Sequence, residues 1–194
     1  HSIRRRQRQM CIRDRSSPIR AFCGHIGDVD CVAWHPNSNY VATGSSDRTV
    51  RLWDVSTGRC TRLFAGHTSG VTALAFSPDG QSISTADDSG IIHSWDLDSA
   101  RCFKTMLGHE NAVYSLDYSG GGGEILASAG ADDTVRIWDH KDGLESVVTG
   151  IIPKIAPTKT FRTKNCPVVN AQFTRRNLLL AFGSRRMPVY HHIN

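Results

Sequence analysis

Short apolar segments recur along this chain at a regular interval, and they are the strongest indication of its structure. Three six-residue segments begin at residues 29, 71 and 113 and carry apolar or aromatic side chains at the same relative positions. These side chains are Val29, Val32 and Trp34, then Val71, Leu74 and Phe76, and then Val113, Leu116 and Tyr118. Segments of this kind predict short, largely buried β-strands. Each is followed by a turn sequence, HPNSN, SPDG or SGGGG.

Further strands are predicted after each turn. The stretches YVATGS, SISTA and ILASAG predict a second strand, and a third strand ends at a tryptophan, as in TVRLW and TVRIW. The β-branched residues of the third strand suit a sheet with one solvent-exposed face. CTRLFAG and CFKTMLG predict an outermost fourth strand. The pattern therefore predicts an all-β fold of four-stranded units with almost no helix.

Paired residues mark the repeat. Gly-His pairs stand at 24–25, 66–67 and 108–109, and Trp-Asp pairs stand at 53–54, 95–96 and 138–139. Successive pairs are 42 or 43 residues apart. A Gly-His to Trp-Asp repeat of about 40–45 residues is the sequence signature of a β-propeller blade.

The repeats resemble the blades of WD-repeat proteins. In that family a His before the first strand, a Ser or Thr in the second, an Asp in the next turn and the Trp of the third strand form a hydrogen-bonded set. The resemblance assigns His25, Thr43, Asp47 and Trp53 to the first set, His67, Thr85 and Trp95 to the second, and His109, Ser128, Asp132 and Trp138 to the third.

The second repeat departs from this pattern. An ungapped alignment places Ser89 where the Asp should stand, and Asp88 fits only if the turn shifts by one residue. We therefore expect a weakened set in the second repeat. Three copies of the same residues indicate a structural role, because an enzyme would not need its nucleophile three times. His35, in the first turn, is not a member.

No other residues predict an enzyme, a cofactor site or a metal site. Gly120 to Gly123 lack the Gly-Lys-Ser/Thr continuation of a phosphate-binding loop, and Glu124 would repel phosphate. The pair His191-His192 stands by itself near the end of the sequence. Among six cysteines there is no CxxC pair, so reduced structural cysteines are the better interpretation.

The charge is distributed unevenly. The formal net charge of +5 arises from basic segments at 1–20 and 146–194 around a central part, 21–145, that has seventeen acidic residues against eight basic ones. A basic total favours a nucleic-acid partner in general, but here the predicted blades are acidic. The sequence contains no apolar run of membrane-spanning length and no secretory signal. The cytosol or the nucleus is the expected location.

A closer resemblance narrows the function. HPNSNYVATGSSDRTVRLWD and CPVVNAQFTRRNLLLAFG are similar to the propeller of the WD-repeat TBP-associated factors, the family of TFIID subunit 5 and its SAGA-type relative. The resemblance implies a nuclear, non-enzymatic scaffold for RNA polymerase II transcription initiation. It implies protein partners, especially histone-fold TBP-associated factors, with no cofactor, membrane, small-molecule substrate or direct nucleic-acid contact. A WD-repeat adaptor of another class, such as a ubiquitin-ligase substrate receptor or a signalling scaffold, is the alternative, followed by a basic nucleic-acid-binding module.

The domain layout follows from the same comparison. Residues 1–17 are interpreted as a non-native or disordered Arg-rich extension, and 18–194 as a partial propeller. Its repeats are expected at about 24–65, 66–107 and 108–150, with an insertion at 144–165 and a partial closing blade at 166–190. Three full blades and part of a fourth make about half of the seven-bladed propeller that the family implies. Such an arc cannot close, because propellers typically need 4–8 blades.

Overall fold

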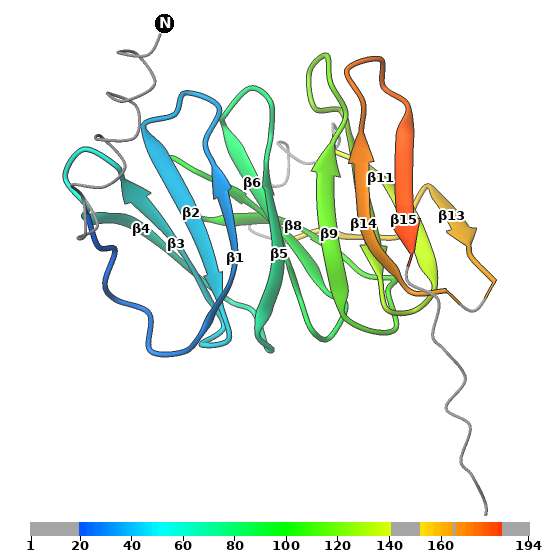
Figure 1. The fold of residues 1–194 in the computed structure, drawn as a ribbon, viewed down its shortest axis with the longest axis horizontal. Helices are drawn as coiled ribbons and strands as arrows, with labels where there is room; N and C mark the ends of the chain where they lie inside the picture. The colour runs from blue at the N-terminus through cyan, green and yellow to red at the C-terminus, as the bar shows by residue number, and fades with distance from the viewer. Residues whose placement is uncertain (1–19, 141–151, 165, 184–194) are drawn as a thin grey trace, which may run out of the picture.

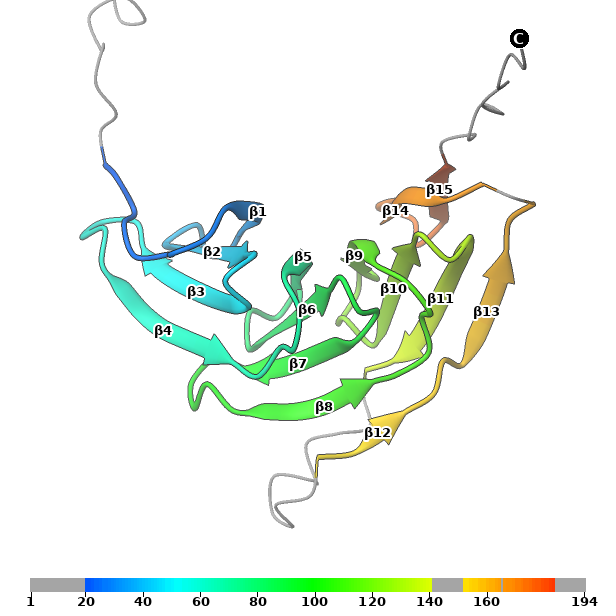
Figure 2. The ribbon, with the colours of Figure 1, turned by 90° about the horizontal axis from the view of Figure 1, so that it is seen from below.

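The chain forms four β-sheets that lie one after another along an open arc (Figures 1 and 2). This computed structural model describes residues 20–140, 152–164 and 166–183. These residues contain strands and turns and no helix, and hence no helix that could cross a membrane. The predicted all-β architecture of a partial WD propeller is confirmed. The Arg-rich extension, His191 and His192 lie outside the described residues.

The first two blades contain the predicted strands. The first is built from β1 (Val29–Trp34), β2 (Tyr40–Ser45), β3 (Thr49–Asp54) and β4 (Cys60–Ala65). The second is built from β5 (Val71–Phe76), β6 (Ser82–Asp87), β7 (Ile92–Asp96) and β8 (Cys102–Met106). In each, neighbouring strands pair antiparallel in sequence order.

The third blade ends later in the sequence than predicted. Its first three strands are β9 (Val113–Tyr118), β10 (Ile125–Gly130) and β11 (Thr134–Asp139), and its fourth is β13 (Lys159–Arg162), paired antiparallel with β11. The blade therefore extends past the boundary expected at residue 150 and into the segment interpreted as an insertion. All four β13 side chains are exposed. The strand thus lacks the apolar alternation by which a strand is recognised in a sequence.

A short strand from the same segment covers an edge of the second blade. β12 (Lys154–Ile155) pairs in parallel with β8 and gives that sheet a fifth strand. The backbone N–H groups of Thr105 and Leu107 donate to the carbonyls of Pro153 and Ile155, each at 3.0 Å. The part of the insertion that the structure describes therefore runs along the outer edges of two blades.

The fourth sheet consists of two strands. β14 (Val168–Phe173) pairs antiparallel with β15 (Leu179–Gly183). Both lie in the segment 166–190 predicted to be a partial closing blade, of which residues 184–190 are outside the described part. β14 packs beside β9, and the Phe173 N–H donates to the Asp117 carboxylate at 2.6 Å.

The hydrophobic core lies between the blades. The inner strands β1, β5, β9 and β14 follow one another along the concave side of the arc (Figure 2). One buried cluster joins the first and second blades and includes Phe64, Val71 and Trp95, and another joins the second and third and includes Met106, Val113 and Trp138. Each blade thus depends on its neighbour for burial, as expected for a repeat architecture.

Both ends of the arc expose apolar side chains that are buried at equivalent positions inside it. Val29, Val32 and Trp34 of β1 are 52, 64 and 62% exposed, whereas the equivalent side chains of β9 are between 0 and 8% exposed. At the other end, Leu180 and Phe182 of β15 are 47 and 57% exposed. These two faces are as apolar as the faces that are buried between blades. Among the described residues no further blade covers them.

The stretch before β1 also matches an interior position. The Phe22 ring lies 5.7 Å from the Trp53 ring at an interplanar angle of 56°, and the Phe64 ring lies 5.8 Å from the Trp95 ring at 57°. Phe22 therefore packs on the first blade in the way that the end of β4 packs on the second.

Candidate functional site

Each of the three four-stranded blades holds a linear set of four hydrogen-bonded side chains. In the first blade the Trp53 indole lies 2.8 Å from the Thr43 hydroxyl, which lies 2.8 Å from His25 Nε2, and His25 Nδ1 lies 2.9 Å from Asp47 Oδ2. In the third blade the matching distances are 2.8 Å from Trp138 to Ser128, 2.7 Å from Ser128 to His109 and 3.0 Å from His109 to Asp132. The structure thus brings together the residues assigned to these two sets.

The chemistry of the groups fixes the direction of the hydrogen bonds. An indole N–H can only donate and an ionised carboxylate can only accept, so the hydroxyl oxygen accepts from the tryptophan and the neutral histidine ring donates to the aspartate. The histidine Nε2 is then an acceptor, and Nδ1 carries the hydrogen that is donated to the carboxylate. Every donor in the set has an acceptor, which is the condition under which a buried polar network stabilises a fold.

The carboxylate ties the set to the surrounding backbone. Asp47 also accepts from the Ile26 N–H at 3.0 Å and from the Thr49 N–H and hydroxyl at 3.0 and 2.6 Å. Burial opposes ionisation of Asp47, but these hydrogen bonds, with the one from His25, outweigh it and hold its pKa below the ordinary value. One side chain therefore joins the segment before β1 to the turn between β2 and β3.

The second blade has a complete set, so the expectation of a weakened one is wrong. The His67 Nδ1 lies 2.9 Å from Oδ2 of Asp87, a residue that neither alignment considered. The Thr85 hydroxyl lies 2.7 Å from His67 Nε2 and 2.7 Å from the Trp95 indole. Asp88 is exposed on the surface and takes no part.

The alignment missed Asp87 because this carboxylate comes from a different position in the repeat. Asp87 is the last residue of β6 and pairs with Val71, in the place that Ser45 takes opposite Val29. Its side chain reaches the position that Asp47 reaches from two residues further along. Ser89 does stand at the aligned position, and its hydroxyl donates to Asp87 Oδ1 at 2.6 Å. An aspartate immediately before the turn was the signal in the sequence.

Replacing Ser89 by Asp should therefore destabilise the protein. The new carboxylate would stand beside the buried Asp87 carboxylate, and like charges in such proximity repel. We expect the free energy of unfolding to fall by about 1–3 kcal/mol, because the Ser89 hydrogen bond is also lost. Denaturant unfolding of the variant measures the change. A stabilised variant would mean that the second blade lacks an effective carboxylate after all.

The third strand of each blade carries a basic or titratable residue near the set. Arg136 donates to Asp132 at 3.2 Å and forms an ion pair, and Arg51 lies 5.9 Å above the Trp53 ring. In the second blade the equivalent residue is His93, whose ring lies 4.6 Å from the His67 ring and whose Nδ1 lies 2.9 Å from the Thr105 hydroxyl. Burial, followed by the neighbouring His67, lowers the pKa of His93 to about 4.

A second partly buried histidine with a lowered pKa lies between the second and third blades. His140 packs edge-on against Tyr118 at 5.0 Å, and its Nε2 lies 3.2 Å from the Ser82 hydroxyl. Burial, together with the nearby Lys104 ammonium, lowers the pKa of His140 to about 4. Both histidines are therefore neutral in the folded protein near neutral pH.

Stability should rise with pH between about 4 and 6.5. In this window the unfolded chain binds protons at His93 and His140 that the folded protein excludes, so unfolding is favoured as the pH falls. Each histidine contributes up to about 1.4 kcal/mol per pH unit. Denaturant unfolding from pH 4.5 to 8 measures the slope, and His93→Gln and His140→Gln should each flatten it. An unchanged slope in both variants would contradict the burial of neutral histidines.

His35 acts between blades and not within a set. Its Nε2 donates to the Gly80 carbonyl at 3.0 Å, and its ring lies 5.1 Å from the Phe76 ring. Its Nδ1 accepts from the Asn37 N–H at 3.1 Å. The residue thus links the first turn of one blade to the first turn of the next.

The geometry of the three sets suits a mechanical role better than catalysis. The Ser128 hydroxyl is buried, its hydrogen is donated to His109, and its oxygen accepts from Trp138. A catalytic nucleophile must be accessible to its substrate. This hydroxyl is buried, and His109 and Trp138 already occupy its hydrogen-bonding positions. Among the described residues no group of three or more His, Cys, Asp or Glu side chains could hold a metal ion. We propose that the sets fasten each blade.

Comparison with known proteins identifies the repeat. The family model "WD domain, G-beta repeat" matches residues 16–54, 58–96 and 100–139, more than half of the chain. TFIID subunit 5 of Caenorhabditis elegans is 52% identical over 50 residues, which are 26% of this chain and 8% of that protein. Human pleiotropic regulator 1 is 42% identical over 40 residues, which are 21% of this chain and 8% of that protein. A ribosome biogenesis protein BOP1 homolog of Monosiga brevicollis is 38% identical over 48 residues, which are 25% of this chain and 6% of that protein.

The matches cover less than a tenth of each of these relatives. They differ in name and agree in the repeat, and the similarity to TFIID subunit 5 agrees with the resemblance to WD-repeat TBP-associated factors. The three repeat matches correspond to the three blades with complete hydrogen-bonded sets. This chain belongs to the WD-repeat family.

Proposed function

We propose that this chain is part of a nuclear, non-enzymatic scaffold subunit of TFIID or of a SAGA-type coactivator. The 52% identity to a TFIID subunit 5 carries the proposal. A scaffold needs rigid surfaces at fixed spacing, and blades with fully satisfied buried networks provide them. The partners are protein subunits of the complex, above all a histone-fold pair of TBP-associated factors.

A scaffold of another WD-repeat class is the second candidate. It is favoured by the 38–49% identity to BOP1 and pleiotropic regulator proteins. Those matches are shorter and less identical than the one to TFIID subunit 5, which is why we place it second.

Binding to a purified histone-fold pair of TBP-associated factors tests the proposal. The expected result is retention of the pair by the immobilised chain, or by a longer form that completes the propeller. If neither form retains the histone-fold pair, the transcription scaffold is rejected and the second candidate is favoured. Deleting residues 1–17 should leave this binding unchanged.

The same deletion separates protein assembly from charge. Residues 1–17 contain six arginines and one acidic residue, so any retention on DNA should weaken steeply with salt and disappear in the deletion variant. Retention that survives the deletion would favour a nucleic-acid-binding module instead, with the basic residues of 146–194 as its site.

A further inference from the structure

The seam between the first and second blades contains an open groove. Its volume is ≈ 340 Å³, and its lining includes Tyr40, Leu52, Thr61 and Arg62 of the first blade and Leu97 and Asp98 of the second. The wall is therefore apolar at Tyr40, Leu52 and Leu97 and polar where β4 begins. A space of this size accommodates a large side chain.

The corresponding space between the second and third blades is filled by the protein itself. The pairing of Cys60 with Trp53 and of Cys102 with Trp95 makes Phe103 the equivalent of Thr61, and Lys104 the equivalent of Arg62. The Phe103 ring is buried and lies 5.7 Å from His140. Lys104 is fully buried, and its ammonium donates to the Asp139 carbonyl at 2.8 Å. At this position the first seam has the smaller Thr61 where the second seam has a phenylalanine.

The two blades also differ at their outer edges. β12 lies along the edge of β8 (Figure 2), takes the hydrogen bonds of Thr105 and Leu107 and packs Ile155 against the core. Thr105 pairs with His93 as Leu63 pairs with Arg51, so the Leu63 N–H points away from the sheet in the same way. In the described part of the chain no strand pairs with this edge of β4, and Leu63 is 49% exposed.

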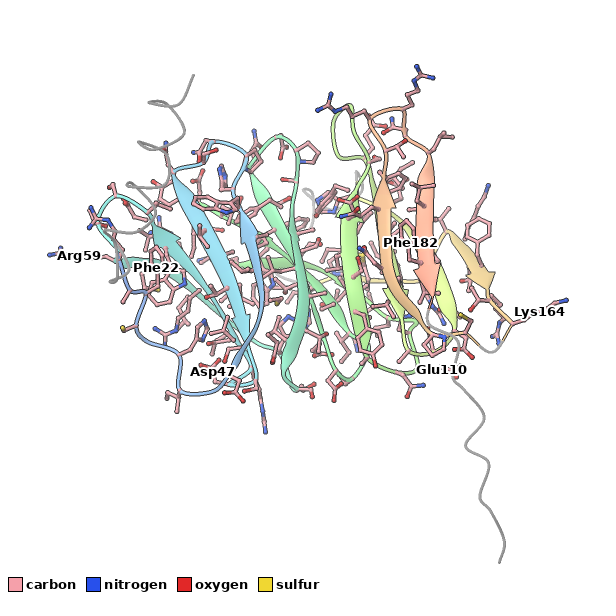
Figure 3. All side chains as sticks on the ribbon, in the orientation of Figure 1. Phe22, Asp47, Arg59, Glu110, Lys164 and Phe182 are labelled. Carbon is pink, nitrogen blue, oxygen red and sulfur yellow. The ribbon has the colours of Figure 1, made fainter. Side chains whose placement is uncertain are left out.

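The open edge carries two arginines. Arg59 and Arg62 are exposed, and Figure 3 shows Arg59 projecting away from the sheet. Neither arginine forms an ion pair with a carboxylate of the described residues. The Arg62 guanidinium donates to two backbone carbonyls, those of Thr61 at 2.9 Å and Asp98 at 3.4 Å. Its positive charge is therefore available to an acidic ligand.

We propose that the edge of β4 and the groove beside it bind an extended acidic segment of a partner protein. The segment adds to β4 as a parallel strand, in the way that β12 adds to β8, and accepts hydrogen bonds from Leu63 and Ala65. An aromatic side chain that precedes the paired residues enters the groove and occupies the space that Phe103 fills in the next seam. Backbone pairing provides affinity, and the pocket and charges provide specificity. This site adds a partner class to the proposed scaffold function. It rests on that function only in assuming that the chain binds proteins.

A designed peptide tests the site. The probe is a fluorescein-labelled, eight-residue peptide with one phenylalanine, two glutamates and the Ile-Pro-x-Ile pattern of residues 152–155. It is titrated against a form of the protein that completes the propeller, and binding is followed by fluorescence anisotropy. Thr61→Phe fills the groove with the residue of the next seam and should weaken binding at least tenfold. Thr61→Val is the matched control, because it keeps the groove open, and it should bind as the parent does.

Two further variants test the edge and the charge. Leu63→Pro removes an outward N–H at an edge position, where proline is tolerated, and should weaken binding to a similar extent. Arg62→Glu should do the same, and Arg101→Glu on the second blade should leave binding unchanged. Hydrogen exchange should show new protection of the Leu63 and Ala65 amides in the presence of the peptide.

The outcomes separate this proposal from the proposed function. Equal binding by the parent and Thr61→Phe, or no protection at Leu63 and Ala65, overturns the docking site. Self-association of the chain that Thr61→Phe abolishes, without peptide binding, overturns it in favour of a second copy as the occupant. If histone-fold partners still bind after any of these results, the scaffold function stands without this site. Peptide binding without histone-fold binding would support the docking site and reject the transcription scaffold.

Discussion

Replacing Trp138 by alanine is expected to lower the free energy of unfolding by about 3–5 kcal/mol, the usual cost of deleting a large aromatic side chain from a core. Trp138 is fully buried and contributes to the cluster between the second and third blades. Its indole also donates to Ser128, so the substitution leaves that buried hydroxyl without its donor. Because Trp53 has an equivalent position and hydrogen bond, its replacement should cost a similar amount.

Denaturant unfolding of a form that contains the neighbouring blades measures this loss. Trp138→Phe is the control, since it removes the indole N–H and retains most of the packing, and it should cost less than the alanine variant. An alanine variant as stable as the parent would contradict the account of the tryptophan as the central packing residue of its blade.

Replacing Asp87 by alanine should have a comparable effect, although the WD-repeat alignment does not identify this residue. We expect a loss of about 3–5 kcal/mol, the range found when one partner of a buried pair is removed. Asp87 and His67 are both fully buried, and the carboxylate accepts from His67, from Ser89 and from the Ile91 N–H at 3.0 Å. Burial opposes the charge of Asp87, but these donors outweigh it and keep its pKa below the ordinary value.

Asp88→Ala is the matched control for this experiment. It removes a carboxylate from the adjacent, exposed position and should change the stability by no more than about 0.5 kcal/mol. Thermal or denaturant unfolding of the two variants side by side decides the assignment. A large loss in Asp88→Ala with little change in Asp87→Ala would restore the alignment-based interpretation and contradict the hydrogen bonds described above.

The strands of the first two blades were predictable because their residues report directly on burial. Val71 and Val113 open strands that lie between two blades, and such strands must be apolar to be buried there. Trp53, Trp95 and Trp138 recur because the same packing is required in each blade. Local pattern and repeat length therefore indicate the same architecture, which is why these elements could be derived without a structure.

Features that depend on contacts across the chain were not predictable. β13 has no buried side chain, and it pairs with β11 although β12 lies between the two in the sequence. Asp87 reaches its partner from a different residue position, and an alignment compares positions and not side-chain directions. Likewise, Tyr118 bonds to Ser84 at 2.6 Å across two blades, and no rule for a single repeat identifies that pair.

The described residues form an open arc of three blades and a partial fourth, and both ends of this arc expose apolar faces. Apolar faces such as Val32 and Trp34 at one end and Phe182 at the other would remain in contact with water in the isolated chain, and unpaired strand edges promote association. Mass in solution by light scattering, together with thermal unfolding, tests this arrangement directly. We expect association or aggregation of the isolated chain, and a monomer with one cooperative transition when the missing blades are supplied. A monomer of 21.4 kDa with a sharp unfolding transition would contradict it.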